Sequence, residues 1–194
     1  KFGSAAHFNG SSSYITLGAT NQFASGTVSI SFWVNPATIS TNYVLLGNGN
    51  GGSFADGDND IYLRSDGYIG YELGQSSSIY EAKYSTTTQL TANTWNHITL
   101  TYDSSLGTNI TQVYVNGVQQ SLSATYAAGG TFSGDIFIGT LDYHIGKRNL
   151  SGLFFDGKID DVRIYSDVLT STEVGYLYNN TTASIPTDNL VAYY

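Results

Sequence analysis

Short runs of the chain alternate apolar and polar residues, which is the pattern of half-buried β-strands. In the clearest run, residues 28–34, Val, Ile, Phe and Val alternate with Ser, Ser and Trp33, so Trp33 is expected on the polar face. Ser65-Asp66-Gly67 predicts the tight turn of a hairpin, and Asn116-Gly117 predicts a turn before Val118. Further strands are expected at 43–46, 61–64, 68–73, 95–102, 111–116, 137–139 and 143–146, and a last one begins at 159.

Two adjacent carboxylates, Asp160 and Asp161, mark the last of these strands. Strict alternation places Asp160 on the same face as Val162 and Ile164, toward the core. A carboxylate there loses hydration energy unless a cation or hydrogen-bond donors meet it, and no nearby Lys or Arg points the same way. Calcium suits such a place because it binds carboxylate, amide and backbone oxygens in flexible geometry. The alternative is that backbone amides or a water molecule satisfy Asp160.

The end of the chain predicts a short helix and a final strand. Thr170-Ser171-Thr172-Glu173 has the spacing of a capping box, so a helix of one or two turns is expected after the last of the strands above. The tail 188–194 is apolar and ends in two Tyr, so we expect it to pair as a strand rather than remain an exposed edge. Residues 183–187 would connect the two, with Pro186 favouring an extended path.

Composition indicates one all-β domain. A chain of 194 residues can bury one sizeable core, and 22 Gly, 2 Pro and 16 Tyr fit many strands joined by tight turns. The absence of Cys excludes a disulfide framework. A net charge of -8 disfavours nucleic acid and anionic membranes as partners, and no apolar run is long enough to cross a bilayer. Because the N-terminus has no signal-peptide pattern, we expect this chain to be part of a longer protein.

Several short blocks in a fixed order resemble the concanavalin A-like, laminin-G-like jelly rolls of bacterial secreted and surface proteins. The resemblance implies a two-sheet antiparallel β-sandwich with one short C-terminal helix, spanning residues 1–182. The tail within 183–194 resembles the strand that opens such domains, so it either closes this domain or begins a following repeat. The blocks are Phe8-Asn9-Gly10, Tyr14-Ile15, 28–34, Trp95-Asn96-His97-Ile98, 113–117, Ile145-Gly146-Lys147 and 154–177.

The resemblance also suggests where calcium would bind. In the family's pattern the Asn9-Gly10 turn lies beside the strand with the paired acids, so Asn9, Gly10 and Asp160 are expected to hold a structural Ca2+. A possible second site is the alternating set Asp56, Asp58 and Asp60. This set is not an EF-hand loop, because glycine and glutamate are missing from the required positions. The alternative for it is a solvated loop whose side chains cap turns.

Catalysis is not expected. Glycosidases with this fold place two glutamates on one face of one strand, whereas this chain has only Glu72, Glu81 and Glu173, well separated. Its three histidines are dispersed, and His97 alternates with threonines in a way typical of a sheet surface.

A binding function is therefore the preferred hypothesis. Aromatic faces and planar polar groups hold sugars, and candidates of both kinds occur here. We predict a non-catalytic, calcium-stabilised carbohydrate-binding domain that binds a glycan or polysaccharide, as a monomeric module of a secreted or cell-surface protein. The alternatives are an adhesin that recognises a protein and a spacer with no ligand. The candidate ligand-binding residues are Tyr62, Tyr71, Glu72, Asp142, Tyr143, His144 and Arg148.

Overall fold

A computed structural model gives the arrangement of the chain and describes residues 3–18, 26–49, 59–75, 79–107, 110–123, 126–128 (backbone only), 132, 135–136, 141–149, 152–180 and 185–194. Its strands form two sheets. Sheet A contains β1 (Ala6–Asn9), β3 (Thr27–Pro36), β8 (Asn96–Asp103), β9 (Thr111–Val115), β10 (Val118–Gln119), β13 (Asp156–Tyr165) and β14 (Leu190–Tyr193). Sheet B contains β2 (Ile15–Gly18), β4 (Tyr43–Gly47), β5 (Asp60–Leu63), β6 (Ile69–Gly74), β7 (Tyr80–Tyr84), β11 (Tyr126–Ala128) and β12 (Tyr143–Ile145).

The strand order confirms the predicted antiparallel sandwich. Sheet A runs β1-β13-β3-β8-β9-β10, with β14 also paired to β13, and sheet B runs β11-β7-β6-β5-β4-β12-β2. The predicted hairpin between β5 and β6 is present, and β8 pairs with β9 as expected. The Asn116-Gly117 turn has φ angles of 52° and 78° and joins β9 to β10. The strand expected at 137–139 lies outside the described residues.

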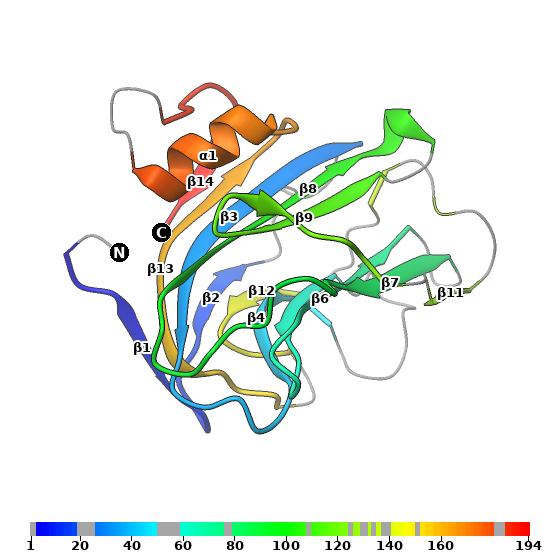
Figure 1. The fold of residues 1–194 in the computed structure, drawn as a ribbon. Helices are drawn as coiled ribbons and strands as arrows, with labels where there is room; N and C mark the ends of the chain where they lie inside the picture. Colours follow the sequence, from blue (N-terminus) through cyan, green and yellow to red (C-terminus); the bar gives the residue numbers. More distant parts are fainter. Residues whose placement is uncertain are drawn as a thin grey trace.

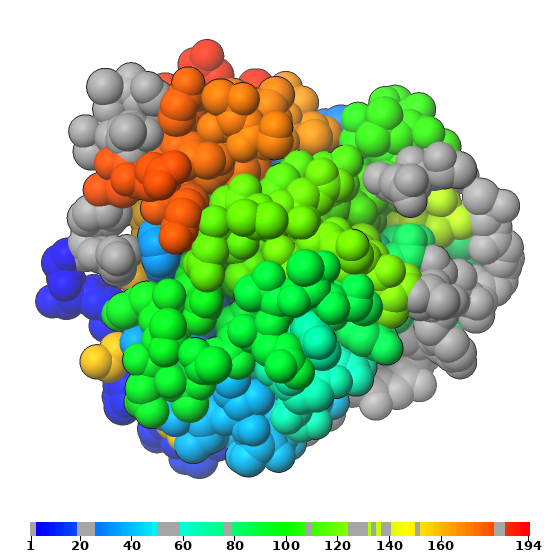
Figure 2. Space-filling model, viewed as in Figure 1, coloured from blue at the N-terminus to red at the C-terminus, as the bar shows by residue number. Residues whose placement is uncertain are grey.

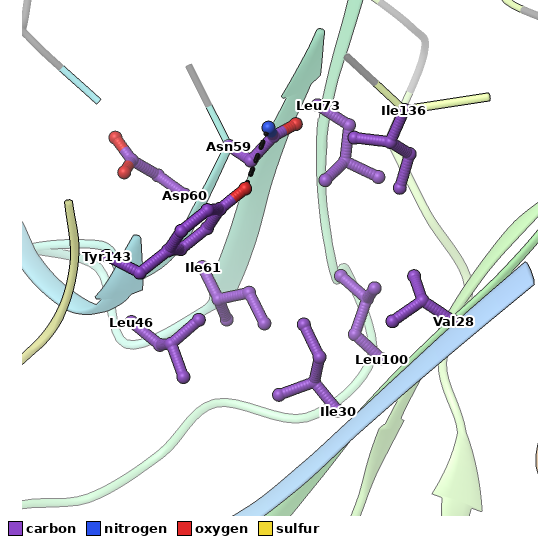
Figure 3. Close-up of a pocket in the computed structure, with 10 residues that line it drawn as sticks. All are labelled: Val28, Ile30, Leu46, Asn59, Asp60, Ile61, Leu73, Leu100, Ile136 and Tyr143. Carbon is purple, nitrogen blue, oxygen red and sulfur yellow. Dashed lines mark hydrogen bonds between the residues drawn. The ribbon is translucent and has the colours of Figure 1, made fainter. Parts of the chain in front are cut away.

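The core lies between the two sheets and is apolar. Ile30 and Leu100 of sheet A face Leu46 and Ile61 of sheet B around a small interior cavity (Figure 3). The cavity has a volume of about 10 Å³, which is the space of a single water molecule at most. The interior therefore has no room for a sugar at this position.

A β-bulge in β13 changes the predicted direction of Asp160. The register with β3 shifts by one residue just after Asp160, which lies opposite Trp33. Asp161 has a φ of 56°, a left-handed conformation that Asp tolerates better than most residues. Since directly opposed residues share a face, Asp160 lies with Trp33 on the outer face. The prediction that Asp160 faces the core with Val162 and Ile164 is wrong, because strict alternation does not continue through a bulge.

The helix α1 (Ser171–Asn179) begins at the predicted capping box. The Thr170 hydroxyl accepts the Glu173 amide at 3.3 Å, and the Glu173 carboxylate accepts the Thr170 amide at 2.8 Å. With nine residues the helix is slightly longer than the two turns expected. A 3-10 turn, η3 (Ser104–Leu106), is the other helical segment among the described residues.

The helix covers the outer face of sheet A (Figure 1). Val174 and Leu177 of α1 pack in one apolar cluster with Tyr114 and Tyr165 of the sheet. The ring of Tyr178 lies against Gly117 in the turn between β9 and β10, and in Figure 2 the orange helix region meets the green strands there. This packing leaves the outer face of sheet B as the sheet surface without a covering helix among the described elements.

Trp33 and His97 lie beneath the helix. Trp33 is on the outer face of β3 as predicted, and its ring stacks on Tyr178 with centroids 5.9 Å apart. His97 is also on the predicted outer face, but it is buried because α1 covers it, and its Nε2 pairs with the Ser31 hydroxyl at 2.8 Å. Burial lowers the pKa of His97 to about 3, so the ring is neutral and serves the packing of the helix.

The tail pairs with the same chain. Strand β14 lies antiparallel to β13, with Ala192 opposite Ile164, and the Val162 and Tyr194 backbones exchange two hydrogen bonds of 2.9 Å. The strand predicted at 188–194 therefore exists and extends sheet A. No helix among the described residues is long and apolar enough to cross a membrane.

Candidate glycan-binding site

The outer face of sheet B carries a row of aromatic side chains. Tyr62 lies opposite Gly70, which in turn lies opposite Tyr84, in the register of β5, β6 and β7. A Cβ atom at Gly70 would collide with the Tyr62 ring, so glycine allows this ring to lie across β6. The Arg64 guanidinium lies 4.0 Å from the centroid of the Tyr84 ring. Burial raises the pKa of Tyr62 to about 12, which keeps its hydroxyl a hydrogen-bond donor.

Arg148 joins two carboxylates beside this aromatic row. Its Nε donates to Oδ2 of Asp60 and its Nη2 donates to Oε2 of Glu72, both at 2.6 Å. The Asp60 side chain is 0% exposed, whereas the Glu72 side chain is 23% exposed and reaches the surface. Asp60 and Glu72 are directly opposed on β5 and β6, so the two carboxylates approach one guanidinium from one face of the sheet.

The buried Asp60 carboxylate is closely surrounded by backbone. The Gly49 amide donates to Oδ1 of Asp60 at 3.0 Å, and a Cβ on Gly47 or Gly49 would collide with the carboxylate. Burial raises the pKa of Asp60, while the Arg148 charge and these hydrogen bonds oppose the rise. Asp60 therefore acts as the anchor that fixes the orientation of Arg148.

These side chains line a groove, here termed the sheet-B groove. Tyr62, Arg64, Glu72 and Arg148 supply its aromatic and charged groups, and the volume is about 130 Å³. Asn42, Val44 and Leu153 complete the lining.

A second hollow adjoins the sheet-B groove and shares Asn42 and Leu153 with it. This neighbouring hollow has a volume of about 370 Å³ and is also lined by Asn9, Phe154 and Asp156. Leu153 stands between the two hollows with a φ of 27°, and its carbonyl accepts the Val44 amide at 3.2 Å. The two hollows are thus adjoining parts of one surface.

The structure brings together three of the predicted ligand-binding residues: Tyr62, Glu72 and Arg148. His144 is on the same face, opposite Gly47, but it is buried against the ring of Tyr14 with centroids 5.3 Å apart.

The other three candidates do not join the groove. Asp142 is exposed just before β12 and lines neither hollow. Tyr71 and Tyr143 are fully buried and point into the core, where Tyr71 donates to Glu81 at 2.7 Å and Tyr143 accepts from Asn59 at 3.0 Å (Figure 3). Both side chains therefore belong to the core.

The predicted calcium residues are not brought together. Asn9 lies opposite Asp156, while Asp160 lies further along β13, past the Ala6–Ile159 pair. The Asn9 side-chain oxygen already accepts the amides of 11, 12 and 13 at 2.9 to 3.1 Å, so it closes a turn. The carboxylate beside Gly10 is that of Asp156.

The second predicted calcium set is only partly described. Asp56 and Asp58 lie outside the described residues, and Asp60 is bonded to Arg148. Among the described residues, no group of three or more His, Cys, Asp or Glu side chains is arranged to hold a metal ion.

The carboxylates Asp60, Glu72 and Glu81 each have a cationic partner. Glu81 is buried on the inner face and bonded to Lys83 at 2.9 Å, whereas Glu72 is on the outer face of the neighbouring strand. Asp60 and Glu72 share a face, and both are bonded to Arg148.

The sequence interpretation missed Arg64, Gly70, Asn42 and Leu153. Arg64 alternates with Tyr62 and was detectable by the period of two, and a glycine inside a strand is a known sign of close approach. Asn42 and Leu153 lie in connections, where the sequence carries no comparable signal.

Comparison with known proteins assigns the family. A laminin G-type model of the concanavalin A-like lectin/glucanases superfamily matches residues 9–175. The chain belongs to this superfamily. No significant match was found among curated proteins.

Solved structures share the fold. Domain 4 of AbnA, an extracellular GH43 arabinanase from Geobacillus stearothermophilus solved with arabinotriose, is 26% identical, with a TM-score of 0.67 over 92% of this chain and 78% of that one. A candidate carbohydrate-binding protein from Bacteroides ovatus is 20% identical, with a TM-score of 0.69; this chain is 98% covered but spans only 50% of that protein. The CBM40 domain of a Ruminococcus gnavus sialidase, solved with α2,3-sialyllactose, is 18% identical, with a TM-score of 0.68 over 91% and 96% of the two chains.

Proposed function

We propose that this chain is a non-catalytic carbohydrate-binding module that holds a glycan in the sheet-B groove. The observation that carries the proposal is the Tyr62 ring lying across Gly70 beside the Arg148–Glu72 pair. A sugar ring presents an apolar C–H face that packs on an aromatic ring, and its hydroxyls pair with planar donors and acceptors. The groove offers both kinds of group on one surface.

The relatives support this assignment. The AbnA domain, at 26% identity, was solved with a bound oligosaccharide. Because this chain matches one domain of an extracellular enzyme and half of the Bacteroides ovatus protein, we propose a monomeric module within a longer secreted or cell-surface protein.

The absence of catalysis is part of the proposal. Hydrolysis of a glycosidic bond needs one carboxyl group that donates a proton and one that acts as base or nucleophile. Asp60 and Glu72 are both bonded to Arg148, so neither is positioned as an independent proton donor or base. The described groove therefore suits binding rather than bond cleavage.

Calcium binding remains a proposal from the sequence. Asp156, rather than Asp160, is the carboxylate that the register places beside Asn9 and Gly10. If a calcium ion binds at the Asn9-Gly10 turn, Asp156 is the side chain expected to bind it. The ion would stabilise the domain because it binds the folded state alone.

A glycan array tests the proposed function. Wild type and Tyr62→Ala are labelled and applied to the same array, after circular dichroism has shown that both are folded. Tyr176→Ala is the matched control, because Tyr176 is 37% exposed on α1, over the other sheet. We expect wild-type hits that Tyr62→Ala loses and Tyr176→Ala retains. A blank array, or hits that Tyr62→Ala leaves unchanged, would reject the site and favour the adhesin or spacer interpretation.

A further inference from the structure

The arginines of the sheet-B groove are already neutralised by the protein itself. Arg148 is bonded to Asp60 and Glu72, and Arg64 is bonded to Asp66 by three contacts of 2.8 to 3.2 Å. Each arginine of the groove thus already has an acidic partner: Glu72 lines the groove, Asp60 is buried and Asp66 lies outside the lining. An anionic sugar would have to displace one of these carboxylates or tolerate its repulsion.

The neighbouring hollow also carries a negative charge. Asp156 is the charged residue among the described residues of its lining, which otherwise offers amides, hydroxyls and aromatic rings. Lys147, the cation next to Arg148 in sequence, lies 3.8 Å from the centroid of the Tyr14 ring and lines neither hollow. The net charge of the whole chain, -8, acts in the same direction at longer range.

Resting on the proposed function, we infer that the site selects neutral glycans and rejects acidic ones such as sialylated or uronic-acid sugars. Arg148 then serves as a fixed planar donor to sugar hydroxyls, since its orientation is set by Asp60 and its charge is balanced by Glu72. Glu72 is consequently the specificity residue. It has the partly exposed carboxylate of the pair, so it is the one that an acidic ligand would meet.

The test is an array of matched pairs, run in EDTA so that no cation bridges protein and ligand, after circular dichroism has shown that the chain is folded in EDTA. Each neutral oligosaccharide is printed beside its counterpart with a C6 carboxylate, and lactose is printed beside 3′-sialyllactose. We expect wild type to bind the neutral members at least tenfold more tightly than their acidic partners. Glu72→Gln frees one arm of Arg148, and should reduce this ratio several-fold.

Asp188→Asn is the charge-matched control, because Asp188 is remote in the chain from both hollows and lines neither of them. It removes one negative charge from the chain and should leave the ratio unchanged. Tighter binding of the acidic members by wild type would overturn the inference while leaving the proposed function in place. Equal ratios in wild type and Glu72→Gln would overturn the role of Glu72. A blank array would overturn the proposed function, and the inference with it.

Discussion

Replacing Arg148 by Met should destabilise the domain strongly, because it leaves the Asp60 carboxylate buried without its cation. The side chain of Asp60 is 0% exposed, and its remaining donor among the described residues is the Gly49 amide. Breaking a buried ion pair by removing one partner costs about 3–5 kcal/mol. For a chain of this size each kcal/mol lowers the unfolding midpoint by about 2–4 °C, so we expect a drop of roughly 6–20 °C.

The assays are thermal unfolding, which gives the midpoint, and urea unfolding, which gives the free energy, both followed by tryptophan fluorescence. Arg64→Met is the matched control, because Arg64 and its partner Asp66 are 31% and 41% exposed and such pairs contribute at most about 1 kcal/mol. Combining Arg148→Met with Asp60→Asn should restore part of the loss, since the buried charge is then gone. An Arg148→Met variant within about 1 kcal/mol of wild type would refute the view that this pair is buried and coupled.

The loss of stability in Arg148→Met should depend on pH. Burial already raises the pKa of Asp60, and removing Arg148 removes an opposing interaction, so the folded-state pKa rises further above its ordinary value of 3.8. Between the ordinary and the raised pKa, the folded state binds more protons than the unfolded state, so stability falls as pH rises. The deficit of Arg148→Met relative to wild type should therefore shrink on acidification. A deficit independent of pH would contradict this cause.

Three further predictions follow from particular contacts. Burial lowers the pKa of His97 from its ordinary 6.5 to about 3, so the free energy of unfolding should fall as the pH drops from 6.5 towards 3. His97→Gln should make this dependence on pH less steep, and equal slopes in the variant and wild type would contradict the role of His97. Gly70→Ala should displace the Tyr62 ring and weaken glycan binding at least tenfold in calorimetric titration, whereas unchanged affinity would argue against a platform. Calcium should raise the unfolding midpoint relative to EDTA, and Asp156→Asn should abolish the difference; no effect of chelation would reject the ion.

The fold could be predicted because alternation and turns act locally. The run at 28–34, the hairpin around Gly67 and the capping box at Thr170 each carry their own signal within a few residues, and all three are confirmed. The direction of the Asp160 side chain could not be predicted from the same alternation. The bulge at Asp161 adds one residue to the strand, so side chains before and after it no longer follow one alternation between the two faces.

The site was only partly predictable for a different reason. Tyr71 and Glu72 are neighbours on one strand and cannot both face the ligand, so alternation itself could have removed Tyr71. The pairing of Arg148 with Asp60 joins residues 88 positions apart. It depends on β12 lying beside β4 and β4 beside β5, which is an order of strands that no local pattern encodes.

Amide chemical-shift mapping can locate a bound glycan on the surface of the protein. A 15N-labelled chain is titrated with the neutral oligosaccharide that gives the tightest array signal. If the glycan binds in the sheet-B groove, the shifting amides should cluster on β5 and β6, near Gly70, and around Arg148 and Leu153, while those of α1 stay unchanged. Shifts confined to α1 and the outer face of sheet A, or shifts that Tyr62→Ala does not abolish, would contradict the assignment of the sheet-B groove as the glycan site.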